Sequence, residues 1–283
     1  MTRAWPGLVL VACHGTPSSA SDAAVDAAHP VDASVVDAAD AAITVDAMDA
    51  RVEGCGPDSI ETTPDHCIDR YEVTVADYRA CASAKLCSQP AVTSEWNGIR
   101  DVDHGLFDPL CTASASDADR RPMTCVDFKS AGDYCASRQR KLPSSADWDA
   151  IAGADPYPWG IGSPVSGLLN ACGSECVAWK KAHAGDLARS TMPGLDVRGD
   201  AFPGDDGNLG PGPVGSFPMG NATSGAADVL GNVAEWTSEG SAGRHVVRGG
   251  SWLSSRGELK KSSPRLLVPD STRTATIGFR CVR

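Results

Sequence analysis

Ten of the eleven cysteines lie between Cys55 and Cys281, and the remaining one, Cys13, stands near the N-terminus. In a reducing cytosol so many cysteines would serve as metal ligands or free thiols, whereas an exported protein would pair them. Ten is an even number, as five disulfides require. The alternative is a set of scattered buried thiols. We therefore expect an exported domain that is held together by disulfides.

The first twelve residues resemble a bacterial export signal. Arg3 supplies a positive charge, and residues 8–11 form the centre of a short apolar stretch. The sequence L-V-A-C at residues 10–13 resembles the lipobox of bacterial lipoproteins, which implies cleavage before Cys13 and a diacylglycerol on its thiol. Ordinary secretion with an incidental cysteine is the alternative. We expect residues 1–12 to be a lipoprotein signal peptide and the mature protein to be anchored by lipid to a membrane of the bacterial cell envelope, on the periplasmic side or at the cell surface.

Residues 13–50 are rich in Ala and Asp and predict a disordered linker. Within residues 16–50 there are seven Asp and no Lys, Arg, Glu or aromatic residue, so the segment cannot bury enough apolar surface to offset the entropy of ordering it. Residues 51–283 hold 24 basic and 29 acidic side chains, a net charge of only −5 of the total −11. No basic patch is visible, and we expect no binding to nucleic acid.

Residues 51–283 have the composition of one loop-rich domain. Two capping boxes and one capping Asp predict short helices over residues 74–84, 127–137 and 144–152. Most of the 29 glycines lie in the second half of the chain, so regular elements there must be short. Residues 246–248 and 277–280 are predicted to be strands.

Six short motifs follow one another in order across the domain and together resemble the formylglycine-generating enzyme family, also called sulfatase-modifying factors. They are D-R-Y-E-V-T at 69–74, R-K-L-P-S-S-A-D-W-D at 140–149, Y-P-W-G at 157–160, G-N-V-A-E-W at 231–236, R-G-G-S-W at 248–252 and G-F-R-C at 278–281. The family's opening strand, with its G-G-x-F-x-M-G pattern, is missing or degenerate around residues 53–66. The resemblance implies a single α+β domain of the C-type-lectin-like kind with little regular secondary structure.

The resemblance does not extend to the catalytic cysteines. Enzymes of this family oxidise a substrate cysteine to formylglycine with O2 and Cu(I), which two thiolates of a C-x4-C segment hold shortly after R-G-G-S-W. Ser254 and Leu259 stand at these positions. A hydroxyl is a hard ligand and leucine offers none, whereas Cu(I) selects soft thiolates. No cysteine lies between Cys176 and Cys281, so a shifted alignment does not restore the pair. We therefore expect no copper and no catalytic residue. A serine nucleophile would need a base, and His245 has no recognisable triad context.

The resemblance and the spacing of the cysteines suggest three disulfides. The family's link between a helix and the final G-F-R-C motif implies the pair Cys135–Cys281. Short spacing favours local pairs, which are Cys81–Cys87 and Cys172–Cys176. The latter could instead be half of a zinc site, with His183 as the nearest further ligand, although an oxidising compartment favours the disulfide. The remaining cysteines allow three connectivities among Cys55, Cys67, Cys111 and Cys125.

Two structural calcium sites are also implied by the resemblance. Hard oxygen ligands in irregular loops suit Ca2+. The first site would use the side chains of Asn170 and Asp206 and the carbonyls of Ala171 and Asn208. The second would use the side chains of Asp228 and Glu235 and the carbonyls of Gly231 and Val233. Without the family, Asp206 would be interpreted as a turn residue and Glu235 as an acid at the edge of the core.

These observations favour a lipid-anchored, non-catalytic binding or scaffold module that takes a peptide, a protein or a glycan. This step is an analogy from the fold, which does not by itself fix function. Two alternatives remain: an oxidoreductase of the same superfamily with a different metal site, and an inert structural lipoprotein. The sequence does not identify the ligand.

Overall fold

The three helices that the sequence predicts begin at their predicted caps. In the computed structural model, which describes residues 55–64, 66–260 and 265–283, the side chains of Thr74, Asp127 and Ser144 each accept a hydrogen bond from a backbone amide of the first turn. The helices are α1 (Val75–Ser83), α3 (Phe128–Ser137) and α4 (Ser145–Ala152).

Other helices begin without a predicted cap. The N-cap residues of α2 and α5 are Arg100 and Gly173. Neither provides a side-chain oxygen to accept the usual capping hydrogen bond. These helices are α2 (Asp101–Phe107), α5 (Ser174–Ala182) and α6 (Ala184–Leu187). The short 3-10 helices are η1 (Asp108–Leu110), η2 (Thr112–Ser114), η3 (Pro218–Gly220) and η4 (Arg256–Glu258).

The strands form two small sheets. An antiparallel hairpin pairs β1 (Ser59–Thr63) with β2 (His66–Asp69), so strands occupy the place where the family's opening pattern is degenerate. The second sheet has the order β5-β4-β3-β6, in which β3 runs parallel to β6 and the other neighbours are antiparallel. Its strands are β3 (Ala234–Ser241), β4 (Arg244–Arg248), β5 (Leu266–Pro269) and β6 (Ile277–Gly278). The last strand is shorter than predicted.

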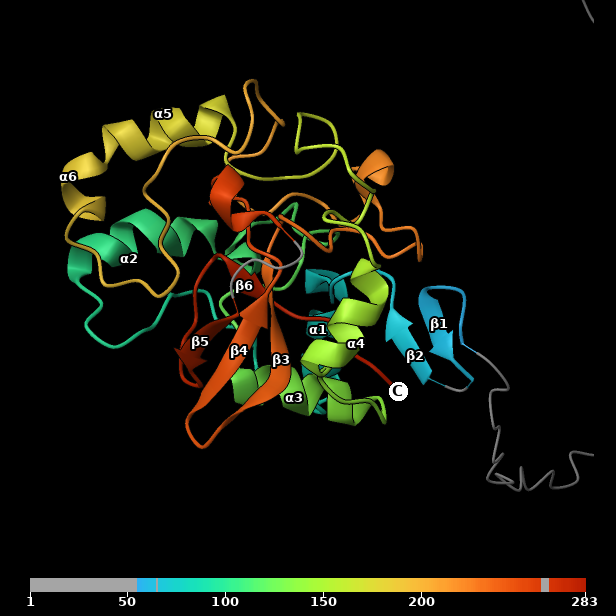
Figure 1. Cartoon of the computed structure of the whole chain (residues 1–283). Helices are drawn as coiled ribbons and strands as arrows, with labels where there is room; N and C mark the ends of the chain where they lie inside the picture. Colours follow the sequence, from blue (N-terminus) through green and yellow to red (C-terminus); the bar gives the residue numbers. More distant parts are fainter. Residues whose placement is uncertain (1–54, 65, 261–264) are drawn as a thin grey trace, which may run out of the picture. The chain divides into compact units, whose positions relative to one another are not determined.

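The largest core lies between this sheet and the helices α1 and α3, and α3 runs beside β3 and β4 in Figure 1. Tyr78 of α1 stacks on Tyr134 of α3, and both rings meet Phe279 edge-on. Trp236 of β3 is fully buried and donates its indole hydrogen to the carbonyl of Val126 at 3.0 Å. The buried side chains of α3, which are Ala131, Tyr134 and Cys135, face this core.

A second core lies between α4 and the β1–β2 hairpin. Trp148 and Ile151 of α4 are buried with Ile60 of β1 and Ile68 of β2. Arg248 at the end of β4 lies over the Trp148 ring, with its guanidinium carbon 4.3 Å from the ring centroid. Loop residues of the glycine-rich half, among them Ala171 and Val229, are buried in this second core next to residues of the candidate site.

Five disulfides join the ten cysteines from Cys55 onward. Three are the pairs that the sequence suggests, and the other two resolve the connectivities left open. The pairs are Cys55–Cys67, Cys81–Cys87, Cys111–Cys125, Cys135–Cys281 and Cys172–Cys176. Cys172 and Cys176 are bonded to each other, so they are not half of a zinc site.

The mixture of short helices and small sheets confirms the α+β class and the loop-rich character of the domain. In the part of the chain that the structure describes, none of the helices has both the length and the apolar character to cross a bilayer. The predicted signal peptide, Cys13 and the linker of residues 13–50 lie outside the described residues.

Candidate functional site

A hydroxyl and a buried leucine are the side chains at the two positions where the sequence comparison expects the family's thiolate pair, Ser254 and Leu259. The Oγ of Ser254 accepts a hydrogen bond from the amide of Ser251 at 3.0 Å. Leu259 is fully buried and belongs to the core around Trp148. A Cβ atom on Gly250 would meet the Ser254 Oγ at 3.1 Å and the Leu259 Cδ2 at 3.2 Å. These contacts place both side chains against the R-G-G-S-W turn, where neither offers a soft ligand.

The space at this position is small. The cavity that includes Gly250, Ser251 and Ser254 has a volume of about 80 Å3, and Leu266 and Ile277 also line it. Sites for small molecules usually have several hundred Å3. The apolar side chains around Ser254 therefore leave little room for a substrate side chain beside it.

No thiolate or histidine cluster replaces the copper pair in the described residues. All ten described cysteines are in disulfides. Each of the four described histidines has its own hydrogen-bond partner, and none contacts another histidine. His66 bonds to Asp147, His104 to Asp108, His183 to the Trp179 carbonyl and His245 to Asp270. The ring of His245 also stacks on Phe128 with a centroid distance of 3.5 Å. His245 is therefore held by Asp270 and Phe128 rather than by a serine.

The residues of the first expected calcium site come together in the structure. The Asp206 carboxylate accepts hydrogen bonds from the amides of Ala171 at 2.8 Å and Asn208 at 3.0 Å. Asn170 is buried, and its Nδ2 donates to the Gly210 carbonyl at 3.0 Å. The Oδ1 of Asn170 is buried and has no hydrogen-bond partner in the described structure. A buried oxygen without a partner is costly, and a bound cation would satisfy it.

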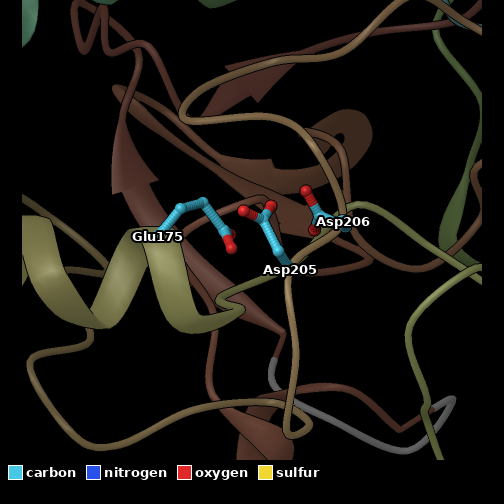
Figure 2. A group of neighbouring side chains, drawn as sticks. All are labelled: Glu175, Asp205 and Asp206. Carbon is cyan, nitrogen blue, oxygen red and sulfur yellow. The ribbon is translucent and has the colours of Figure 1, made fainter. Parts of the chain in front are cut away.

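Two further acids stand beside Asp206 that the sequence did not single out. Carboxylate oxygens of Glu175, Asp205 and Asp206 lie within 4.8 Å of one another, and they are the one group of three potential metal-binding side chains found in the described residues. Figure 2 shows Glu175, in the first turn of α5, and Asp205, on a loop, turned toward each other. Burial raises the pKa of Asp206, and burial together with the nearby Asp206 charge raises the pKa of Glu175.

None of these three acids forms an ion pair with a described Lys, Arg or His side chain. Glu175 accepts a hydrogen bond from the Gly173 amide at 3.1 Å, and Asp205 accepts one from the Gly207 amide at 2.6 Å. Three neighbouring carboxylates are the kind of oxygen donor that a hard cation prefers, and Asn170 adds an amide oxygen without a described hydrogen-bond partner. The residues present therefore fit calcium. Glu175 and Asp205 could add negative charge beside the ligands of the first site that the sequence predicts.

The second expected site is buried and includes a counter-ion. The Glu235 carboxylate is paired with Arg280 through two hydrogen bonds, of 2.8 and 2.5 Å. Asp228 has a left-handed backbone, with φ of 54°, and accepts a hydrogen bond from the Gly215 amide at 2.6 Å. Burial raises the pKa of Asp228 to about 6. The carbonyl-bearing residues Gly231 and Val233 lie in the same buried turn.

Glu72 is a third carboxyl at this second site. Its Oε2 accepts a hydrogen bond from Asn232 at 3.0 Å, whereas its buried Oε1 has no hydrogen-bond partner in the described structure. Burial, followed by the charges of Asp228 and Glu235, raises the pKa of Glu72 well above its usual range. Of the three carboxyl groups only Glu235 pairs with Arg280, whereas Glu72 and Asp228 influence that guanidinium through their charge, so a cation here would balance the excess. The only sequence signal for Glu72 was its place in the motif at residues 69–74.

One side chain links the two sites. Asn232, in the G-N-V-A-E-W motif, accepts a hydrogen bond from the Asn170 side chain at 2.9 Å and donates one to Glu72 at 3.0 Å. The backbone amide of Asn232 also donates a hydrogen bond to the backbone carbonyl of Asn170 at 2.7 Å. Asn170 of the first site and Glu72 of the second are therefore held in one buried hydrogen-bond network.

These features are accompanied by similarity over most of the chain to a known family. The model of the Sulfatase-modifying factor enzyme 1-like domain matches residues 27–283. The chain belongs to this family.

Curated relatives have different names. "Inactive C-alpha-formylglycine-generating enzyme 2" of Mus musculus is 30% identical over 174 residues, which cover 56% of this chain and 48% of that protein. "Hercynine oxygenase" of Mycolicibacterium thermoresistibile is 27% identical over 172 residues, 50% of this chain and 31% of that protein. The chain spans about half or less of the length of these two relatives, so their names do not decide its activity.

A solved structure supports the fold alone. "Structure of PvdO from Pseudomonas aeruginosa" matches with a TM-score of 0.52 and 21% sequence identity, covering 77% of this chain and 80% of that one.

Proposed function

We propose that this chain is a non-catalytic binding module of the sulfatase-modifying factor family. The observation that carries the proposal is the pair Ser254 and Leu259 at the position of the copper thiolates. Leu259 is fully buried in the core, and Ser254 is hydrogen-bonded to the backbone of Ser251. Neither side chain can donate a thiolate to Cu(I), and the ten described cysteines are in disulfides.

The test is copper binding and turnover by the purified protein with its disulfides intact. After loading with Cu(I) and desalting, we expect no stoichiometric copper, and no aldehyde in a cysteine-containing peptide incubated with O2. The matched positive control is the formylglycine-generating enzyme of Mycobacterium tuberculosis, a relative 27% identical over 197 residues. One tightly held Cu(I) per chain, or formation of the aldehyde, would contradict the proposal.

The two acidic clusters would serve as structural calcium sites in such a module. Asn170, Asp206, Asp228 and Glu235, with the carbonyls of neighbouring residues, would hold the ions, and bound calcium would offset the buried negative charge. Metal ions of this kind fix irregular loops, which make up most of the glycine-rich half. Metal analysis of the purified protein would find calcium if this assignment is right.

The module would be tethered to an envelope membrane by lipid on Cys13, with residues 14–50 as an extended spacer. Its support is the sequence alone, because these residues lie outside the described structure. Two acyl chains anchor a protein stably, and a self-repelling acidic chain holds the folded part away from the surface.

An oxidoreductase with another metal is the alternative function, and the hercynine oxygenase relatives are its main support. Such a site needs ligands other than cysteine. The one three-residue cluster in the described residues contains only carboxylates, from Glu175, Asp205 and Asp206, and each described histidine is held elsewhere. Loading with Fe(II) followed by O2 consumption with a thiol substrate would separate the two functions: sustained consumption supports the oxidoreductase.

A further inference from the structure

The binding proposal leaves open where a ligand would sit, since the position of the former copper site has a cavity of only about 80 Å3. A different cleft of about 480 Å3 opens beside the β1–β2 hairpin, a size typical of small-ligand sites. Its lining comes from the lip of residues 56–59, from residues 69–77, from the C-terminal end of α3 and from Arg120 and Val214. This cleft is lined by residues remote in sequence from the R-G-G-S-W segment.

Four exposed charged side chains in the lining of this cleft, two of each sign, form no ion pair in the described structure. Arg120 and Arg138 are exposed and form no ion pair with any described residue, and the same is true of Asp58 and Asp77. The guanidinium of Arg138 makes a cation–π contact with Tyr134, with its carbon 5.1 Å from the ring centroid. These two cations and two anions offer hydrogen-bond donors and acceptors beside the Asp69–Arg140 ion pair and the buried Glu72, which also line the cleft.

Two disulfides hold the walls of the cleft. Cys55–Cys67 ties the lip next to Gly56 to strand β2, and Cys135–Cys281 ties α3 to the C-terminal segment. The Cys281 amide donates to Asp69, which is also paired with Arg140. Covalent and ionic links on both sides fix the lining before a ligand arrives, which lowers the entropy lost on binding.

We propose that this cleft binds a neutral saccharide of one or two rings; the inference rests on the proposed binding function. A simple anion would face Asp58 and Asp77, and a simple cation would face Arg120 and Arg138. Sugar hydroxyls both donate and accept, so neighbouring hydroxyls satisfy carboxylates and guanidiniums at the same time. The half-buried ring of Tyr71 in the lining offers apolar surface for the C–H face of a pyranose.

The experiment is binding of the full chain to an array of neutral and acidic oligosaccharides, followed by calorimetric titration of the tightest neutral one. Arg138→Ala and Asp58→Ala should each weaken binding by about tenfold or more, since each removes a charged hydrogen-bonding group. Both side chains are exposed, so the fold should survive. Lys181→Ala, which removes an exposed charge on α5 away from the cleft lining, is the matched control and should bind as the parent does.

Three results would overturn the assignment. Unchanged affinity in both cleft variants would place the sugar elsewhere. Binding of inorganic sulfate or a tripeptide at this cleft, with no saccharide bound, would show that the ligand class is wrong. A blank array, while the chain and its Arg138→Ala variant equally retain a polypeptide from envelope extract, would refute the saccharide cleft and leave the binding function standing. Copper turnover would refute the proposed function itself.

Discussion

The disulfide between Cys135 and Cys281 should contribute more to stability than the one between Cys172 and Cys176. Both pairs are fully buried, so replacing each pair by alanine removes similar apolar contact from a packed interior. The pairs differ in the loop that each closes, with sequence separations of 146 and 4 residues. The comparison therefore isolates the length of the loop.

The chain-entropy model gives the expected magnitudes. Closing a loop of the longer kind restricts the unfolded chain by about 5 kcal/mol at 25 °C, whereas the short loop restricts it by roughly 2 kcal/mol. The expected difference in the free energy of unfolding is thus about 3 kcal/mol. Residual order in the unfolded chain would reduce this difference, because cross-linked segments that are already close lose less freedom.

The assay is urea denaturation, without reductant, of Cys135→Ala with Cys281→Ala and of Cys172→Ala with Cys176→Ala. It should be run in EDTA as well as in calcium, since Glu175 lies inside the short loop and belongs to the acidic cluster. The reasoning is refuted if the short pair costs as much as the long pair in EDTA. A loss at the short pair that appears only in calcium would instead report on the metal site.

Two further outcomes are expected. In EDTA, burial holds the pKa of Asp228 at about 6. The folded state therefore binds this proton more tightly than the unfolded chain does. The free energy of unfolding should fall as the pH rises from about 4 to about 6. Urea midpoints should show that Asp228→Asn removes this pH dependence of the free energy of unfolding and that calcium reduces it in the parent protein. An identical pH dependence in parent and variant would contradict the role of Asp228. Cys13→Ser should move the protein from the membrane fraction to the soluble fraction after a salt wash, and a variant that stays with the membrane would show that the lipobox assignment is wrong.

Local signals in the sequence were enough to predict the capped helices. Thr74, Asp127 and Ser144 are side chains that satisfy free amides of a first turn, so their position fixes where a helix begins. Helix α5 could not be found in this way, because Gly173 stands at its N-cap and the Cys172–Cys176 disulfide spans its first turn. Helix α2 likewise begins after Arg100, whose backbone amide and guanidinium both donate to the carboxylate of Asp103.

The candidate site was predictable only in part, because its members come from distant segments. The resemblance supplied Asp206 and Asp228, whereas Glu72 and Glu175 joined them through tertiary packing. Glu72 is linked to the second site by Asn232, which is 160 residues away in sequence. No spacing rule reaches over such a distance. The cleft beside the hairpin has the same origin, since its walls meet only when the chain has folded and the disulfides have formed.

The motifs that identify the family stabilise its fold, the frame of the domain, more than they contribute to the copper chemistry. Arg280 of G-F-R-C pairs with Glu235 of G-N-V-A-E-W and donates to the carbonyls of Asp69 and Arg70 in the first motif, so three motifs meet at one buried guanidinium. Trp252 of R-G-G-S-W donates its indole hydrogen to the Ala275 carbonyl at 3.0 Å. These interactions do not involve position 254 or 259. The frame can therefore persist whether these two positions hold thiolates or not, and a match to the motifs predicts the fold without predicting the oxidation.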